Sequence, residues 1–549
     1  MDKNIQYYNS RYRALLDDRM NWESIWREAA YYTIPNAFFL FDDYKTSEDG
    51  EVSFKRDSYE RNISNTAFDA VDVFVSGMQN AASPQSRPWI KLKPEDDELE
   101  DNHAFKVWAS EAEETLHGTL ASKLSESISN MYRNIYTFGV SCALIETDFN
   151  NIVKVIDVPV GSFCLSQNDT GQVDAVYREF RLKAVDAVRI FGDKVSDKIK
   201  SAYNAGKMDI YFDFVHAVET NEKHDKDNPL SKPFESVYFE VGASDFLKKG
   251  GYTDFPYVCP RWSREPHHTY GTSIVMRALP SIKMLQSLCK SVIQLKQQLS
   301  NPIILVDPAV AEAAKALAYP MGGNVIPMLN RMGDPPVVPL ITVQPAAIQV
   351  AQDERDRQEA RTSQSLYVNL FQMLSMQDNV RTATEVIEMK NESLAMIAPK
   401  TQSLHNEGLR KYAELALRAL VETGKIYAPE GLELDVLEVE FDSILTQAQK
   451  MVGLSQTERA MNGIALAMQT ASLTNGKLDP DKIVEVIVEQ TGVDPSVMQS
   501  QEDVQATRQA QAQAQAQAQQ MAMAEQAAKA TNTLSNSNMD NLQQMMGAR

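Results

Sequence analysis

The sequence predicts a mainly helical α+β protein in which a strand-rich segment is inserted among the helices. Three observations predict this fold class. Apolar residues recur at helical spacing over long stretches, a β-branched region begins at Gly139, and a proline-rich stretch separates two further helical patterns. The chain has 549 residues, 43% of them apolar and 23% charged. It is therefore long enough for three or four domains, and most of it should be folded.

Helices dominate the N-terminal part of the chain. Tyr8, Tyr12, Trp22 and Trp26 lie near helical spacing, and Pro35 ends the pattern because proline breaks helices. Two more helical patterns follow, with a short strand between them. The expected elements are helices over 5–33, 67–78 and 103–135, a strand over 88–92, and a loop or edge hairpin over 38–60.

The pattern changes at Gly139 to β-branched or alternating runs that are separated by Gly, Asn and Asp. One helix, near 184–206, interrupts them. The expected strands are 140–145, 152–158, 173–182, 210–218, 237–241 and 257–258.

A helix with a one-sided apolar stripe is expected between Pro280 and Leu299. Lys283, Lys290 and Gln297 fall seven residues apart on the opposite side, as in a helix that packs among neighbouring copies. The stripe consists of Ile282, Leu285, Leu288, Val292, Leu295 and Leu299. Residues 301–345 then contain eight of the 23 prolines, which predicts a compact excursion of short strands and turns.

The chain returns through a polar helix over about 346–372, where Asp353 and Arg357 have the i,i+4 spacing that supports a solvated helix. Thr382 and Glu385 form a capping box for a long helix, which should kink at Pro399 and end near Gly424. The remaining expectations are a strand over 432–441, two or three helices over 446–490, and a Gln-Ala segment from 505 that is ordered only if other copies pack against it.

Charge and motifs exclude several function classes. With 54 Lys and Arg against 74 Asp and Glu, the net charge is −20, which is wrong for a protein that grips DNA phosphates but compatible with one that surrounds DNA. No phosphate-binding loop or HExxH motif is present, and the acidic run that starts at Glu95 is typical of a solvated loop. We therefore expect no catalytic, cofactor or metal site, and neither a signal peptide nor a membrane span.

Five short motifs occur in a particular order along the chain. They are Ser83-Pro84-Gln85-Ser86-Arg87-Pro88-Trp89-Ile90-Lys91-Leu92, Phe138-Gly139-Val140, Tyr270-Gly271-Thr272-Ser273, Leu279-Pro280-Ser281-Ile282-Lys283 and Thr382-Ala383-Thr384-Glu385-Val386. In this order and spacing, from about Tyr8 to Gln505, the chain resembles the head-to-tail connector, or portal, proteins of short-tailed bacteriophages. The family usually has an aromatic residue where Ile90 stands.

The resemblance implies a portal-type subunit with a β-rich wing, a two-helix stem, a small α/β clip and a helical crown, and a twelve-fold ring at one vertex of the capsid. The implied divisions are a wing over 1–279, stem helices over 280–300 and 346–372, a clip over 301–345, a channel loop over 373–382, a long kinked wing helix and strand over 383–445, a crown over 446–504, and a Gln/Ala-rich tail over 505–549 that is either a helical barrel or disordered.

The same resemblance implies a structural, non-enzymatic role in the virion, with assembly in the host cytoplasm. Double-stranded DNA would pass through the ring without sequence specificity during packaging and ejection. The implied protein partners are the large terminase, the major capsid and scaffolding proteins, the tail adaptor and the internal core proteins.

Only residues on the wall of such a channel would affect the passing duplex, because salt screens charges beyond about 8 Å. The lining candidates are Lys283, Lys290, Ser375, Gln377, Asp378, Asn379 and Arg381, within the loop from Ser375 to Arg381 and on the helix before the clip. Pairing of both lysines with acids of a neighbouring subunit is an equal alternative. Two rival functions are another ring of the virion, such as a tail adaptor or internal core protein, and a DNA-processing enzyme, for which the chain lacks the motifs.

Overall fold

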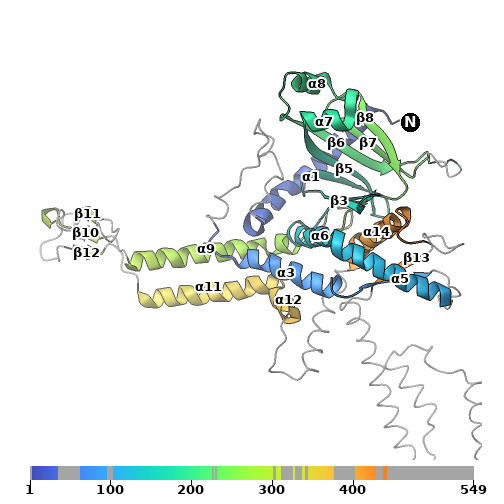
Figure 1. Ribbon diagram of the computed structural model, residues 1–549. Helices are drawn as coiled ribbons and strands as arrows, with labels where there is room; N and C mark the ends of the chain where they lie inside the picture. The colour runs from blue at the N-terminus through green and yellow to red at the C-terminus, as the bar shows by residue number, and fades with distance from the viewer. Residues whose placement is uncertain are drawn as a thin grey trace, which may run out of the picture. The chain divides into compact units, whose positions relative to one another are not determined.

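The computed structural model describes residues 3–34, 62–94, 103–224, 228, 231–300, 304–310, 325–327, 337–339, 344–375, 402–427 and 437–441. Helices and antiparallel sheets occur together in these ranges, so the predicted mainly helical α+β class is confirmed (Figure 1). The expected loop over 38–60, the capping box, the kink at Pro399, the helices over 446–490 and the Gln-Ala tail lie outside the described residues.

The predicted N-terminal helices are all present. They are α1 (Ile5–Thr33), α3 (Thr66–Ala82), and the third helix as α5 (His103–Thr119), a π-helical turn η2 (Leu120–Leu124) and α6 (Ser125–Phe138). The backbone N–H of Tyr7 donates to Asn4 Oδ1 over 2.9 Å, so a side chain caps the start of α1. Gly139 ends α6 with φ +79°, a left-handed conformation that glycine adopts without strain.

The strand-rich segment folds into two antiparallel sheets. One has the order β4-β5-β6-β7-β8 and the other β3-β2-β9. The bounds are β2 (Ala143–Asp148), β3 (Ile152–Asp157), β4 (Phe163–Gln167), β5 (Val173–Lys183), β6 (Tyr211–Thr220), β7 (Phe234–Glu240), β8 (Phe246–Tyr252) and β9 (Tyr257–Val258), with α7 (Ala184–Phe191) and α8 (Asp197–Asn204) between β5 and β6.

The prediction missed β4 and β8. The first is only five residues long, too short to show an alternating pattern, and the second contains Lys248-Lys249-Gly250-Gly251. Lysine and glycine are depleted from strands, and an edge strand gains little from burial, so the sequence carries little strand signal there.

The helix α1 is held on the five-stranded sheet by aromatic packing and by one buried carboxylate. The Tyr12 ring stacks on that of Tyr177, with centroids 6.2 Å apart. Glu219 of β6 is buried and accepts hydrogen bonds from Lys3 Nζ at 3.0 Å and Arg11 Nε at 2.9 Å. Because a buried carboxylate is costly unless it is paired, these two contacts fix the N-terminal turns of α1 on the sheet.

Two segments far apart in sequence form a separate two-stranded sheet. Here β1 (Ile90–Pro94) pairs antiparallel with β13 (Leu437–Phe441), so that Ile90 lies opposite Phe441. The Trp89 and Phe441 rings stack with centroids 6.0 Å apart. The predicted end of the long helix is also confirmed, since α14 (Arg410–Glu422) is followed by Gly424 with φ +68°.

Candidate functional site: a helical hairpin and its base

One long helix precedes the proline-rich segment in the sequence and another follows it, and the two helices lie side by side (Figure 1). They are α9 (Ile274–Ser300) and α11 (Pro345–Ser365). The predicted short strands of the excursion are β10 (Ile304–Val306), β11 (Val325–Pro327) and β12 (Val337–Pro339), in the order β11-β10-β12. We call α9 and α11 the hairpin.

The expectation that the first hairpin helix begins at Pro280 is wrong. It begins at Ile274, where Ser273 Oγ accepts a hydrogen bond from the N–H of Met276 over 2.8 Å. Proline is usual at the first turn of a helix, which led to the wrong boundary, but here Pro280 lies inside α9. The same Ser273 hydroxyl donates to the carbonyl of Thr137 over 2.9 Å, so the cap also ties α9 to α6.

The contact between α9 and α11 is partly apolar and partly polar. Ile282, Leu285 and Val292 of the predicted stripe are buried, whereas Leu299 is exposed. On α11, Gln358 and Thr362 are buried: the Gln358 side chain donates to the carbonyl of Ser281 over 3.3 Å, and the Thr362 hydroxyl donates to the carbonyl of Gln358 over 2.7 Å and lies 3.4 Å from that of Ser281. These bonds satisfy the polar atoms that the contact buries, and they fix the two helices in register.

The base of the hairpin is tied to α3 by side chains from both helices. Gln286 of α9 accepts from the N–H groups of Ile63 and Ser64 at 2.9 and 3.1 Å and donates to the carbonyl of Ser64 at 2.9 Å. Thr66 Oγ1 donates to Glu359 Oε1 of α11 over 3.2 Å. The N-terminal end of α3 therefore contacts both hairpin helices and fixes their position.

The returning helix was predicted as one helix over 346–372, but it is two. The chain breaks at Tyr367, whose φ is +57°, and continues as α12 (Val368–Ser375). The Tyr136 hydroxyl donates to the carbonyl of Leu366 over 2.8 Å, which satisfies a carbonyl freed by the break. Phe371 of α12 packs so closely against α3 that a Cβ added to Gly77 would lie 2.5 Å from Phe371 Cδ1.

The predicted channel-lining residues fall in different places. Lys283 is half exposed and forms an ion pair with Glu28 of its own chain. Lys290 is exposed and has no ion-pair partner within the described part of the chain. Ser375 is the last residue of α12, and Gln377, Asp378, Asn379 and Arg381 lie outside the described residues.

The charge of α9 departs from that of the whole chain. This helix contains Arg277, Lys283, Lys290 and Lys296 and no acidic residue, although the chain has a net charge of −20. All four side chains are exposed. The hairpin also exposes large apolar side chains that its two helices do not cover: Met284 (47% exposed), Ile293 (42%), Leu299 (48%) and Val350 (69%). Met284 and Ile293 are nine residues apart, which places them on opposite sides of α9, so the exposed apolar residues lie on more than one face of the hairpin.

A buried arginine connects the helix that leads into α14 with the sheets. Arg261 is fully buried, and its guanidinium donates to Glu407 Oε1 at 2.7 Å and to the carbonyl of Gly171 at 2.8 Å. Glu407 lies in η6, a π-helical turn (His405–Leu409) that precedes α14. No local sequence pattern indicated this residue, because its partners are 90 and 146 positions away.

The described residues show neither a metal-binding cluster nor a membrane-spanning helix. Within these residues, no three His, Cys, Asp or Glu side chains are grouped closely enough to hold a metal ion. Likewise, none of the helices described is long and apolar enough to cross a membrane. His216 is buried between Tyr257 and Ser236, and burial lowers its pKa to about 3, so the imidazole is neutral and serves as a fixed hydrogen-bonding group.

Comparison with known proteins gives matches over most of the chain. The family model described as "Bacteriophage head to tail connecting protein" matches residues 6–498. A "Probable portal protein" of Bordetella phage BPP-1 is 28% identical over 502 residues, 89% of this chain and 88% of that protein. A "Portal protein" of Salmonella phage epsilon15 is 28% identical over 508 residues, 90% of this chain and 89% of that protein.

Two solved structures show weaker similarity. A chain from "Neck of empty GTA particle computed with C6 symmetry" has a TM-score of 0.32 and 11% identity, covering 79% of this chain and 91% of that chain. A chain from "Virion of native gene transfer agent (GTA) particle" has a TM-score of 0.34 and 10% identity with the same two coverages, 79% and 91%.

Proposed function

The chain belongs to the family of bacteriophage head to tail connecting proteins, and we propose that it is the portal subunit of a tailed phage. Many copies would close into a ring at one capsid vertex, and double-stranded DNA would pass through the ring during packaging and ejection. The two curated relatives with portal names, each matched over about nine tenths of its length, support this role.

The observation that carries the proposal is the surface of the hairpin. Met284 and Ile293 of α9 and Val350 of α11 are exposed apolar residues on a two-helix element that already has its own internal contact. Burial of a large apolar side chain contributes about 1.5–3 kcal/mol, so leaving these residues in water is unfavourable. Packing of each hairpin between its two neighbours in a ring would cover them.

We assign the hairpin to the stem of the ring and extend the first stem helix from the expected 280–300 back to Ile274. The clip, expected over 301–345, ends before α11 begins at Pro345; the channel loop, expected over 373–382, begins after α12 ends at Ser375; and 446–504 form the crown. Residues 1–273 and 383–445 form the wing, whose described parts hold the base of the hairpin through Gln286 and Glu359.

The charge of the hairpin suits a conduit. Duplex DNA carries one negative charge per about 1.7 Å, and a protein that neutralises many phosphates binds tightly. Lys283 and Lys290 are seven residues apart, which is about 10.5 Å along a helix, slightly more than the screening length. Lys283 is partly neutralised by Glu28. Lys290 is thus the better lining candidate, and sparse rings of single lysines would attract DNA without holding it.

The remaining roles follow the family resemblance. The clip would dock the large terminase during packaging and the tail adaptor afterwards. The wing and crown would contact the major capsid, scaffolding and internal core proteins. The subunit would be structural rather than enzymatic, with the energy for packaging supplied by the terminase.

The proposal is tested by placing charges on the exposed apolar surface of the hairpin. Met284→Asp with Ile293→Asp should stop ring formation, measured by light scattering after size-exclusion chromatography, while the far-ultraviolet circular dichroism stays unchanged. The matched control is Phe149→Asp, because Phe149 is 80% exposed in a turn after β2, away from the hairpin. Rings that form equally well in both variants would exclude the hairpin as the subunit contact.

A further inference from the structure

The five-stranded sheet has an open edge at β8. This strand is the last in the order β4-β5-β6-β7-β8, and no other described strand pairs with its outer side. Lys248, Lys249, Gly250 and Gly251 are all exposed. An edge strand presents unpaired N–H and C=O groups, which makes it a template for another extended chain unless it is protected.

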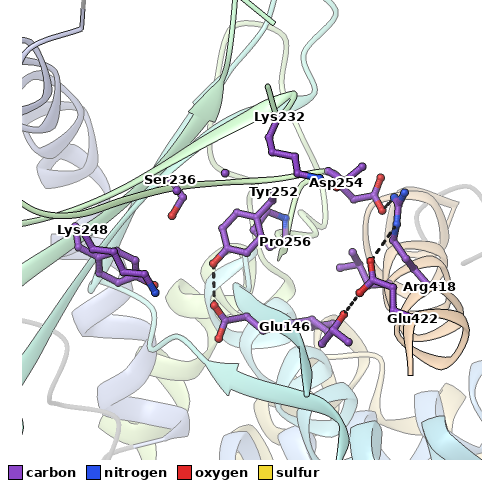
Figure 2. Close-up of a pocket in the computed structure, with 16 residues that line it drawn as sticks. Glu146, Lys232, Ser236, Lys248, Tyr252, Asp254, Pro256, Arg418 and Glu422 are labelled. Atoms are coloured by element: carbon purple, nitrogen blue, oxygen red, sulfur yellow. Dashed lines mark hydrogen bonds and ion pairs between the residues drawn. The ribbon is translucent and has the colours of Figure 1, made fainter. Parts of the chain in front are cut away.

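A hollow lies on each side of this edge. The first has a volume of about 590 Å³ and lies between the sheet, β2 and α14, with Glu146, Lys248, Tyr252 and Arg418 in its lining (Figure 2). The second has a volume of about 680 Å³, with Lys3 and Lys249 in its lining. Side chains of neighbouring strand residues point to opposite faces, so Lys248 lines the first hollow and Lys249 the second.

Gly250 lines both hollows and has no structural reason within the described chain to be glycine. A Cβ built on Gly250 would meet no described atom within 4 Å, and its φ lies outside the left-handed region. Gly251 differs, since a Cβ there would lie 2.7 Å from Lys232 Cβ and 2.8 Å from the carbonyl oxygen of Phe234. A glycine inside a strand weakens it and often marks the close approach of another molecule.

Both hollows contain acidic as well as basic residues, with Glu222 and Glu235 in the second, but among the described residues the lysines at the edge are not neutralised by them. Arg418 is already paired with Asp254 and lies beside Glu422, and Glu146 is paired with Lys154 and accepts from the Tyr252 hydroxyl at 2.8 Å. By contrast, Lys232, Lys248 and Lys249 have no carboxylate partner in the part of the chain that is described. Their ammonium groups contact Thr253 Oγ1 at 3.1 Å, the Tyr238 ring at 5.9 Å and the Phe246 ring at 3.9 Å, respectively.

We propose that the β8 edge binds an extended acidic peptide segment of another protein, which adds to the sheet as a further strand. Backbone hydrogen bonds to the open edge would supply affinity, and the lysines would select acidic side chains. Because Lys248 and Lys249 lie on opposite faces, and neighbouring residues of the added strand also alternate, the preferred segment has acidic residues at consecutive positions. The hollows beside Gly250 would receive its side chains.

The first test uses a fluorescently labelled eight-residue peptide with consecutive glutamates and the full-length protein. Lys248→Glu with Lys249→Glu should weaken binding about tenfold, since each reversal replaces a screened attraction with a repulsion. The matched control is Lys123→Glu with Lys207→Glu, which changes the net charge equally at exposed lysines away from the hollows. Equal loss in both variants, or no loss in the first, would overturn the proposal.

The second test separates strand addition from simple charge attraction. Gly250→Leu fills open space and should fold normally yet weaken peptide binding severalfold, whereas Gly118→Leu, which also points into open space, should bind as the wild type does. Amide hydrogen exchange over 246–252 should slow when the peptide binds and stay unchanged with a peptide N-methylated on alternate amides. Binding without this protection would refute an added strand.

Two further measurements show whether the added strand comes from another protein. If the β8 amides are already protected in the free full-length protein, and become exposed when the copies are separated, the edge is occupied by a second copy of the chain. Tighter binding of a single-stranded oligonucleotide than of the peptide would assign the lysines to nucleic acid. Either result overturns the assignment to an acidic segment of another protein.

Discussion

Replacing Gly77 by alanine tests how the returning helix is held on the body of the protein. Gly77 lies inside α3, where alanine is favoured over glycine by about 0.5–1 kcal/mol. A Cβ at this position would lie 2.5 Å from Phe371 Cδ1, 2.9 Å from its Cβ and 3.0 Å from its Cγ. The clash involves the root of the side chain as well as the ring, so rotation of the ring cannot relieve it.

The higher helix propensity of alanine stabilises the protein and the clash with Phe371 destabilises it, so the net effect depends on which free energy is larger. Phe371 is 2% exposed, so its displacement removes a fully buried aromatic contact. Overpacking of a core costs about 1–3 kcal/mol, and complete loss of a buried phenylalanine costs about 3–5 kcal/mol. After the helix-propensity gain is subtracted, Gly77→Ala should lower the free energy of unfolding by about 2 kcal/mol.

Urea denaturation of Gly77→Ala and of Gly118→Ala measures this difference directly. Gly118 lies in α5, and a Cβ there meets nothing within 4 Å among the described atoms, so Gly118→Ala should stabilise the protein by about 0.5–1 kcal/mol. In a Phe371→Ala background the cost of Gly77→Ala should fall by about 1–2 kcal/mol. If Gly77→Ala stabilises the protein as Gly118→Ala does, α3 and α12 do not make the close contact described above.

The buried and exposed charges lead to three more predictions. Arg261→Met should lower the free energy of unfolding by about 3 kcal/mol, because Glu407 loses the guanidinium that pairs with it and the carbonyl of Gly171 keeps only Arg264 as a donor; a change under about 0.5 kcal/mol in urea denaturation would contradict this. Burial lowers the pKa of His216 to about 3 from an ordinary value near 6.5, so its contribution is complete above pH 6.5 and is lost as the pH falls toward 3, by up to about 1.4 kcal/mol per pH unit. The free energy of unfolding, measured by denaturation at several pH values from about 6.5 to 5, should therefore fall less with decreasing pH in His216→Asn than in the wild type. Equal pH dependence in the two proteins would argue against a buried neutral imidazole. Lys290→Glu should leave rings intact but reduce the amount of DNA retained in filled capsids relative to Lys290→Gln, as measured by gel analysis of capsid DNA, and equal retention would remove Lys290 from the channel wall.

Sequence analysis predicted best those elements whose signal is local. The amphipathic spacing of Tyr8, Tyr12 and Trp26 located α1, and alternating β-branched residues located β5 and β6, because one face of each element is buried. The glycine at position 424 predicted the end of α14, and in the structure it has the left-handed φ that often follows a helix. These signals need no knowledge of distant parts of the chain.

The features that escaped prediction depend on contacts between distant residues. The break at Tyr367 is stabilised by Tyr136, 230 positions from the carbonyl that it binds. The start of α9 at Ile274 depends on Ser273, whose hydroxyl also binds the carbonyl of Thr137. Glu28 as the partner of Lys283 could not be inferred from spacing either. The candidate hairpin was therefore predictable from local patterns, whereas its anchoring depends on the three-dimensional fold.

The central claim is that many copies of this chain close around an open axis. Electron microscopy of the purified full-length protein, viewed along the axis of its assemblies, tests this claim most directly. We expect closed rings whose central hole is wider than a DNA duplex and is surrounded by the α9–α11 hairpins. A single-copy particle, or an assembly without a hole, would contradict the account.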